Sequence, residues 1–486
     1  LYRHLANKFG GEANRGQMAN YWKLSGLDPI GADYAAGDGV STWQLREAQH
    51  ERLAAQNLTH IMKLESRVTR VVYRMFKRGV PVDRDALQQI HDSAQASLNQ
   101  ALSVLPKDFN SKSPSQAQEF LKSRGVTDWP QTPLSLSQPG KPPRYQFNEA
   151  YLKQHEPGRI ILEARKWRTL LDSFIRPLME EHIWPDGRIR PWYHQMANDE
   201  FGTVTARFSC SGPNLQQIPK RNNELSRLLR RAFIVFEDDE WLTADLSQCE
   251  PRLLAHYSEA VALVRGFLSK PFVDAHSSVT IAAGIPEMTG LPFKEAREFG
   301  KRLNQTLITG GGRAHIVGML GPKGEDIYDS FFEAMPEIKT LQKTASKTME
   351  KRGYVISLLG RRARLERRDK SYTAINRLLQ VGNADVIKEA MANMDEYLEA
   401  EGDEVYILNT VHDAVDLGVP PTPRHRAIAE RALGFMCEFG PGRRVDILVP
   451  LAIDYSYGRN WSEATWDAEK NMMGEEADDP RFLVKP

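Results

Sequence analysis

The chain contains few cysteines and no long apolar run. Its three cysteines among 486 residues are Cys210, Cys249 and Cys437, and their spacing matches no metal-binding pattern. So few thiols are typical of a reducing compartment, so we expect a cytoplasmic protein. No stretch of about 18 apolar residues is present, which argues against a membrane span. No signal-peptide pattern is visible either.

The sequence also has no strong excess of positive or negative charge, because its 64 Lys and Arg residues are nearly balanced by 63 Asp and Glu residues. This balance excludes a uniformly basic surface, but nucleic-acid binding depends on local clusters rather than on net charge. Basic clusters occur at residues 227–231, 301–302 and 361–368. Any one of them, taken alone, is more often a solvated helix face. A chain of this length is expected to form two or more subdomains.

Two aspartates far apart in the chain carry the strongest chemical signal. Asp245 ends a short apolar strand at 242–246, and Pro251 suits the first turn of a helix over 251–258. Asp413 lies between two apolar runs, 405–411 and 414–419, which predict a strand–turn–strand hairpin. Carboxylates brought together on neighbouring strands are suited to binding two Mg²⁺ ions, which neutralise charge in phosphoryl transfer.

A basic helix is predicted between these aspartates, over residues 297–310. Arg297, Lys301, Gln305 and Thr309 are spaced four apart and therefore share one face. Two cations on such a face are suited to a triphosphate. An Arg-x3-Lys pair alone is usually solvent-exposed, but its place between the aspartates makes the combination more specific. The three parts together indicate a nucleotidyl transferase.

The rest of the chain alternates between helical and turn-rich segments. Apolar spacing predicts helices over 64–75, 85–105 and 150–183, with loops at 111–115 and 129–143. From residue 186 strands and turns are expected, and residues 259–390 are predicted to be mostly helical. We find no internal repeat.

These residues resemble the family A DNA polymerases, the group of bacterial DNA polymerase I and several phage replicative enzymes. The run from Asp245 to Arg252 (Asp-Leu-Ser-Gln-Cys-Glu-Pro-Arg) is similar to the first motif of that family, Asp-Tyr-Ser-Gln-Ile-Glu-Leu-Arg. The helix at 297–310 resembles the second motif, and Val411-His412-Asp413 resembles the third. Further collinear matches lie at 203–209, 213–219, 274–276, 353–355, 360–362, 376–385 and 458–461. The resemblance extends from about residue 62 to residue 466.

The resemblance implies a role for each matching residue. Asp245 and Asp413, with the Leu246 carbonyl, would hold two Mg²⁺ ions, and Lys301 would bind phosphate and protonate the leaving pyrophosphate. Glu250 would exclude a 2′-hydroxyl. The implied deoxynucleotide-binding set is Arg297, Lys301, Glu250, Gln248, His276, Gln305 and Thr309. The implied contacts to primer–template DNA near its minor groove are Arg207, Asn214, Gln216, Asn376, Gln380 and His412.

The fold implied by the resemblance is an α+β right-hand polymerase with an antiparallel palm sheet and mostly helical fingers and thumb. The palm would comprise residues 61–84, 198–258 and 391–486, the thumb 85–197 and the fingers 259–390. We expect a monomer. The sequence does not identify a processivity factor.

Two other functions remain open. A single-subunit RNA polymerase would share the two aspartates and the basic helix, but Gln248 and Glu250 argue against it. A catalytically silent DNA-binding module is opposed by the intact Asp245, Asp413 and Lys301. Mg²⁺-dependent extension with dNTPs or rNTPs separates these alternatives.

Four positions depart from the pattern of the family. Gln305 replaces an aromatic residue and Thr309 replaces a tyrosine, so base and sugar selection lack an aromatic plane. Ala414 stands where a carboxylate follows the third-motif aspartate, and Ala206 replaces the glycine before Arg207. Asp416 we interpret as a solvated or structural carboxylate.

Residues 1–60 resemble the end of a 3′–5′ proofreading exonuclease domain. Tyr34 and Asp38 occupy the positions of its last catalytic motif, whereas the earlier Asp-x-Glu motif is absent from this sequence. We therefore expect an incomplete exonuclease-like region, without proofreading activity, in this N-terminal segment.

Overall fold

The structure is a computed structural model of the 486-residue chain. It describes all residues except 133–142, 198–200, 219–223, 271–272, 309–310, 366–369, 441 and 474–486. Thr309 lies outside the described residues, so its predicted role is not addressed by the structure. The chain forms two compact units, Leu1–Ser66 and Arg67–Pro486. None of the helices in the described part is long and apolar enough to cross a membrane.

The first unit is helical. It contains α1 (Tyr2–Phe9), a 3₁₀ helix (Arg15–Lys23), α2 (Pro29–Ala55) and the beginning of α3 (Thr59–Arg78). Asp28 caps α2 by accepting the Gly31 N–H, and it also accepts bonds from Lys8 at 2.9 Å and His4 at 2.8 Å. These bonds hold the pKa of Asp28 well below its usual range. Tyr34 lies one helical turn before Asp38 on α2, and a hydrogen bond to Asp38 raises the pKa of Tyr34.

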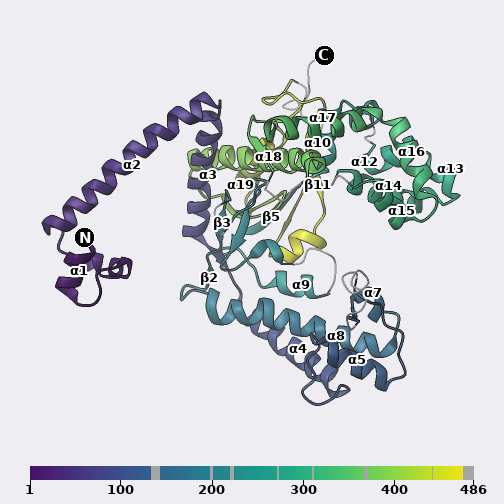
Figure 1. Ribbon diagram of the computed structural model, residues 1–486, viewed down its shortest axis with the longest axis horizontal. Helices are drawn as coiled ribbons and strands as arrows, with labels where there is room; N and C mark the ends of the chain where they lie inside the picture. The colour runs from purple at the N-terminus through teal and green to yellow at the C-terminus, as the bar shows by residue number, and fades with distance from the viewer. Residues whose placement is uncertain are drawn as a thin grey trace. The chain divides into compact units, whose positions relative to one another are not determined.

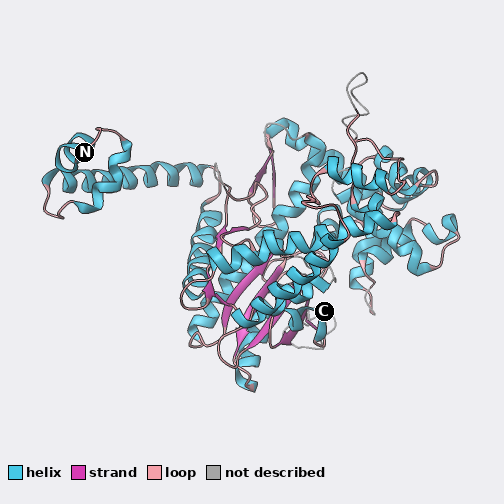
Figure 2. Ribbon diagram, turned by 90° about the horizontal axis from the view of Figure 1, so that it is seen from below, coloured by secondary structure: helices cyan, strands magenta, loops and turns pink. Residues whose placement is uncertain are grey.

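The second unit is built around a five-stranded antiparallel sheet (Figure 2). Its strands are β5 (Glu240–Leu246), β8 (Tyr406–Val411), β9 (Ala414–Val419), β10 (Ile453–Gly458) and β11 (Asn471–Met473), in the order β11-β10-β5-β9-β8. The strand predicted at 242–246 and the hairpin predicted around Asp413 are both confirmed. β8 and β9 are buried along their whole length, which explains their apolar runs.

One helix, α18 (Ala374–Ala400), forms the centre of the packing against this sheet. It packs on α10 (Cys249–Ser258), α17 (Pro336–Arg352), α19 (Pro423–Leu433) and β8. Most of its residues are buried on every side, as expected for a helix inside a core. Lys388 on α18 is fully buried and donates a hydrogen bond to the Gln195 carbonyl at 2.5 Å. The α10 helix begins two residues before the predicted start, at Cys249.

A helical group precedes the sheet in the chain and is shown in the blue and teal colours of Figure 1. It comprises α4 (Arg84–Ser103), α5 (Pro114–Ser123), α7 (Glu149–Leu152), α8 (Glu156–Leu170) and α9 (Glu224–Arg231). The prediction of one continuous helix over 150–183 was wrong. The α8 helix ends at Leu170, and two π-helical turns follow at Leu171–Ile175 and Leu178–His182. The non-helical break in the predicted segment lies at residues 153–155, between α7 and α8, whereas the backbone stays helical through Pro177. Proline in the first turn of α8 suits a helix start, because the missing N–H has no intrahelical partner there.

A second helical group occupies most of residues 259–390, as predicted. It contains α11 (Val261–Leu268), α12 (Ala275–Ala282), α13 (Ile285–Thr289), α14 (Phe293–Ile308), α15 (Arg313–Leu320) and α16 (Gly324–Ala334), followed by the hairpin β6 (Tyr354–Ile356) and β7 (Arg362–Arg364). The helices α12 and α14 approach closely at Gly300, where an added Cβ would lie 2.1 Å from the Thr280 hydroxyl oxygen. A glycine is therefore required at that crossing.

Short elements complete the second unit. They are the pair β1 (Val80–Pro81) and β2 (Arg188–Ile189), the pair β3 (Trp192–His194) and β4 (Ser209–Ser211), three 3₁₀ helices (Leu215–Gln217, Ser371–Thr373 and Gly434–Cys437) and a π-helical turn (Glu463–Asp467). The α+β class and the antiparallel central sheet agree with the prediction.

The turn before β4 carries backbone strain at Ala206. Its φ of 58° lies in the left-handed region, where glycine is favoured, and the Ala206 N–H donates to the Thr203 carbonyl at 3.2 Å. The departure from glycine noted in the sequence therefore has a structural cost. The turn leads directly to Arg207.

Replacing Ala206 with glycine is expected to raise the free energy of unfolding by about 0.5–1 kcal/mol, because it relieves the left-handed strain at a small cost in unfolded-chain entropy. Chemical denaturation of both proteins measures the difference. The matched control is Ala96→Gly in the exposed middle of α4, which is expected to lower stability by about 1 kcal/mol. Equal destabilisation by both substitutions would contradict the assignment of strain to Ala206.

Candidate active site

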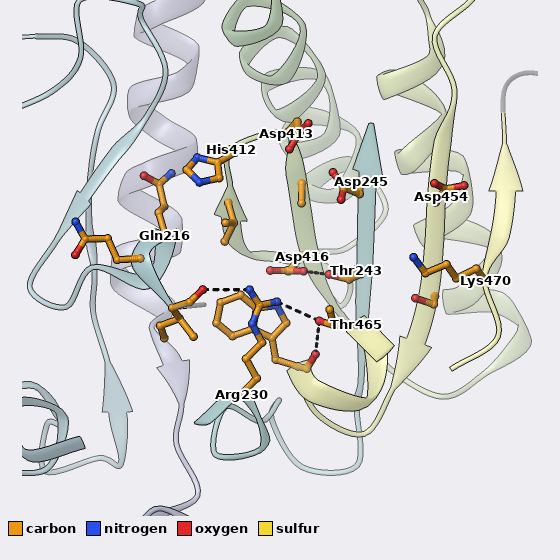
Figure 3. Close-up of a pocket in the computed structure, with 16 residues that line it drawn as sticks. Gln216, Arg230, Thr243, Asp245, His412, Asp413, Asp416, Asp454, Thr465 and Lys470 are labelled. Carbon is orange, nitrogen blue, oxygen red and sulfur yellow. Dashed lines mark hydrogen bonds between the residues drawn. The ribbon is translucent and has the colours of Figure 1, made fainter. Parts of the chain in front are cut away.

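A pocket of about 260 Å³ opens beside the end of β5 (Figure 3). Sixteen residues from five segments of the second unit line it: Gln216, Gln217, Ile218, Arg230, Thr243, Asp245, Val411, His412, Asp413, Ala414, Asp416, Asp454, Ser456, Trp461, Thr465 and Lys470. The structure thus brings Asp245 and Asp413 into one cavity.

Backbone pairing fixes how these two aspartates meet. Asp245 lies opposite Ala414 in the β5–β9 register, and the Leu246 N–H donates to the Asp413 carbonyl at 3.1 Å. Asp413 is at the tip of the β8–β9 hairpin, next to His412, whose φ of 58° is left-handed. A tight turn held by ladders on both sides leaves the Asp413 side chain little freedom to move away from Asp245.

Asp454 is a third carboxylate in the pocket, which the sequence interpretation missed. It lies directly opposite Asp245 in the β5–β10 register, so both side chains point to the same face of the sheet. Lys470, between β10 and β11 in the chain, lines the same pocket. The alternation of Asp454 and Ser456 could have predicted that both side chains share one face of a strand. Only the strand order shows that this face lies beside Asp245.

Arg230 forms part of the pocket floor and was also missed as a single residue, although its cluster was noted. Its side chain is 3% exposed and donates to the Thr465 hydroxyl at 3.2 Å and to the Ile218 carbonyl at 3.3 Å. The guanidinium lies 4.0 Å from the centroid of the Trp461 ring. Burial lowers the pKa of Arg230 to about 10, so it remains cationic beneath the carboxylates at neutral pH.

Asp416 lies in the interior of the sheet, so the solvated alternative for this residue was wrong and the structural one holds. It is 1% exposed, and it accepts hydrogen bonds from the Thr243 hydroxyl and from the Asn409 amide, the latter at 2.8 Å. Burial raises the pKa of Asp416. Side chains alternate between the two faces of a strand, so Asp416 lies on the same face of β9 as Ala414.

Near the start of α10, Glu250 forms an ion pair with Arg207, and both side chains are about one quarter exposed. Gln248, in a left-handed conformation, accepts the Ala275 N–H on its side-chain oxygen at 2.9 Å. The turn after β5 is thereby linked to the beginning of α12. Neither Glu250 nor Gln248 lines the pocket.

The predicted phosphate-binding residues lie on α12 and α14, outside the pocket lining. Arg297 is ion-paired with Asp274 at 2.8 Å and donates to the Ser277 hydroxyl at 3.1 Å. Lys301 is half-buried one turn later, and Gln305 is exposed on the same helix. Burial is the main cause of the lowered pKa of His276, so its imidazole is neutral at pH 7.

Apart from Arg207, which pairs with Glu250, the predicted DNA-contacting residues lie in three places. Gln216 and His412 line the pocket, and the Gln216 amide donates to the Thr410 carbonyl at 3.4 Å. The Asn214 side chain accepts the Gln216 N–H at 3.1 Å, so it shapes the short 3₁₀ turn there. Asn376 and Gln380 are half-buried about one turn apart on α18, away from the pocket lining.

The donor set of the pocket suits a hard divalent cation. Asp245 and Asp413 supply carboxylate oxygens, which are the ligands that Mg²⁺ prefers. In the described part of the chain, no three His, Cys, Asp or Glu side chains converge closely enough to hold a metal by themselves. This fits Mg²⁺, because it binds through one or two carboxylates, retains water and takes further ligands from substrate phosphates.

Comparisons with known proteins place these features in one family. A family model described as DNA polymerase family A matches residues 84–463. A protein named DNA polymerase DpoZ from Vibrio phage phiVC8 is 30% identical to this chain, and the alignment covers 96% of this chain and 76% of the phage protein. DNA polymerase I from Pseudomonas aeruginosa is 28% identical, with 95% of this chain and 50% of that protein covered.

A solved structure agrees with the sequence comparisons. The polymerase domain of Pol1 from M. smegmatis, in complex with DNA primer-template and dNTP, has a TM-score of 0.74 and 26% sequence identity. The match covers 87% of this chain and 74% of that one. The family model spans more than half of the chain and includes every residue of β5, the β8–β9 hairpin and α14. The chain therefore belongs to DNA polymerase family A.

Proposed function

We propose that this chain extends a DNA primer along a DNA template, adding deoxynucleotides to the 3′-hydroxyl with release of pyrophosphate. A member of DNA polymerase family A is a DNA-directed DNA polymerase. The observation that carries the proposal is the placement of Asp245 and Asp413 in one pocket by direct strand pairing.

Asp245 and Asp413 would hold two Mg²⁺ ions, with the Leu246 carbonyl as a further ligand. When bound, these ions lower the pKa of the primer 3′-hydroxyl and stabilise the charge on the pyrophosphate leaving group. The two carboxylates are held near each other because β5 and β9 are paired up to Asp245 and Ala414, and the Leu246 N–H then donates to the Asp413 carbonyl. Arg230, buried below them, limits the repulsion between the acids.

The α14 helix would bind the triphosphate. Arg297 is oriented by Asp274 toward one side of α12, and Lys301 lies on the same face of α14 one turn further. Lys301 would neutralise phosphate charge and give a proton to the leaving pyrophosphate, as the family motif implies. Gln248 connects the turn after β5 to α12, which offers a path by which movement of these helices reaches the pocket.

The subdomain assignment is part of the proposal. The palm would comprise 61–84, 198–258 and 391–486, the thumb 85–197 and the fingers 259–390. The sheet lies within the palm ranges, and α12 and α14 lie within the fingers range. The related Pol1 domain was solved with primer-template and dNTP, which supports those two partners here. Primer extension in Mg²⁺ with dNTPs, compared with rNTPs, tests this function and separates it from RNA polymerase activity.

Asp245→Ala or Asp413→Ala is expected to lower the rate of single-nucleotide addition by on the order of 10³-fold or more, because either change removes a metal ligand. Primer–template affinity should persist, since it depends mainly on phosphate contacts spread over the surface. Rapid-quench extension and a DNA-binding titration measure the two effects. Asp326→Ala, on the exposed side of α16, is the charge-matched control. Near-normal extension by either pocket variant would contradict the metal assignment.

Glu250→Ala is expected to reduce discrimination against ribonucleotides by on the order of 10²-fold, with a smaller loss of deoxynucleotide addition, because it removes the side chain that would block a 2′-hydroxyl. Glu250→Gln is the matched control. It keeps the volume but weakens the ion pair with Arg207. Steady-state dNTP and rNTP kinetics should therefore show normal discrimination for the glutamine variant. Equal loss in both variants would assign the effect to the ion pair instead of to steric exclusion.

A further inference from the structure

A row of buried polar side chains crosses the sheet at the inner wall of the catalytic pocket. In the strand registers, Asn409 on β8 lies opposite Asp416 on β9, Asp416 opposite Thr243 on β5, and Thr243 opposite Ser456 on β10. Asn409, Asp416 and Ser456 are each at most 1% exposed. The row of Ala414, Asp245 and Asp454 lies directly above it, at the pocket.

Hydrogen bonds join three members of this row. The Asn409 amide donates to one carboxylate oxygen of Asp416 at 2.8 Å. The Thr243 hydroxyl donates to the other carboxylate oxygen, a bond drawn in Figure 3. The Tyr193 hydroxyl donates to the Asn409 side-chain oxygen and extends the network to β3. Asp416 therefore connects the strand of Asp245 to the hairpin of Asp413 through its side chain as well as through the backbone.

The hairpin is irregular where Asn409 enters the network. The β8–β9 register shifts between Ile407 and Asn409, which marks a β-bulge. A bulge changes the direction of the residues that follow it and increases local twist. The two residues that follow Val411 are His412 and Asp413, so the bulge helps to set where Asp413 points. The bond from Asn409 to Asp416 lies on the tip side of the bulge and fixes its register.

A buried carboxylate is a costly way to stabilise a sheet. Apolar side chains of similar size would usually give equal or greater stability, whereas removal of one partner of a buried polar pair is strongly destabilising. Such a network is best explained by the geometry that it enforces. Here that geometry is the separation of two strands that each carry a proposed metal ligand.

The position of Asp416 also relates to a departure seen in the sequence. Ala414 stands where the resemblance predicts a carboxylate, and Asp416 lies two residues later on the same face of β9. Two residues along a strand span about 6.8 Å, so the carboxylate of Asp416 lies about that far along β9 from the position of Ala414, next to the proposed metal ligands. There it is 1% exposed, and both of its carboxylate oxygens accept hydrogen bonds, from Thr243 and from Asn409.

We propose that Asp416 is a positioning residue that sets the separation of Asp245 and Asp413 through its bonds to Thr243 and Asn409. This inference rests on the proposed function for the identity of the metal ligands. It assigns to Asp416 no contact with metal or substrate. Its effect on catalysis passes through the register of the hairpin.

Three variants separate positioning from general stability. Asp416→Ala leaves the Asn409 amide and the Thr243 hydroxyl without their acceptor. Asp416→Asn preserves both links, because its carbonyl accepts from Asn409 and its amide donates to the Thr243 oxygen. Asp395→Ala is the control, since Asp395 is a buried carboxylate on α18, paired with Arg74 at 3.3 Å and remote from the pocket lining.

The first measurement is Mn²⁺ binding to the free protein by electron paramagnetic resonance, with Mn²⁺ alone as the probe. The second is the Mg²⁺ concentration that gives half-maximal primer extension, and the third is thermal unfolding. Asp416→Ala should weaken Mn²⁺ affinity by about tenfold or more and raise the Mg²⁺ requirement, as expected when an outer partner of a ligand is lost. Asp416→Asn should remain within about threefold of wild type on this scale. Asp395→Ala should change only the melting temperature.

The inference is overturned if Asp416→Ala melts at a lower temperature yet keeps wild-type Mn²⁺ affinity and Mg²⁺ requirement. If that variant does not fold, Thr243→Val removes only the link to β5 and gives the same comparison. Failure of the wild-type protein to extend primers would instead reject the proposed function, and the Mn²⁺ titration would still test positioning. Asn409→Ala should reproduce the metal effect, and the Asn409→Ala/Asp416→Ala double variant should be no worse than Asp416→Ala alone.

Discussion

The antiparallel pairing of β5 with β9 is the constraint on which the site depends. It places Asp245 opposite Ala414 and lets the Leu246 N–H reach the Asp413 carbonyl. Two short strands that are distant in sequence must therefore meet before Asp245 and Asp413 can share the proposed metal site. The buried helix α18 and the stacked rings of Trp241 and Trp461 support this pairing by covering the sheet with apolar surface.

Local patterns allowed the sequence to predict β5, the β8–β9 hairpin and the mostly helical segment that contains α14. The strands were predicted from short apolar runs bounded by turn residues, and the helical segment from apolar residues at helical spacing. Tertiary packing did not change the secondary structure of these segments. The prediction failed over 150–183, where a turn at residues 153–155 separates α7 from α8 and π-helical turns replace the regular helix after Leu170. The α+β class followed from the family resemblance, whose motifs span most of the chain.

The rest of the pocket could not be predicted because it depends on strand order. Asp454 is a neighbour of Asp245 only because β10 pairs on the other edge of β5, and no local pattern encodes that choice. Arg230 belongs to a cluster that reads as a solvated helix face, yet its guanidinium is buried against Trp461. Asp416 offered two interpretations, and only the contacts of its neighbours decide between them.

The distribution of charge around the pocket shows how one sheet can hold several acids together. Four carboxylates line the cavity, and one of them, Asp416, is only 1% exposed, deeper than Asp245, Asp413 and Asp454. Like charges gathered in one cavity repel one another and push the strands apart unless cations or hydrogen-bond donors oppose them. Arg230 supplies a fixed charge below, and Lys470 lines the same cavity. The remaining negative charge would favour the proposed divalent cations at Asp245 and Asp413. The Asp416 carboxylate is already satisfied by Thr243 and Asn409, and so it can hold the sheet in register without competing for metal.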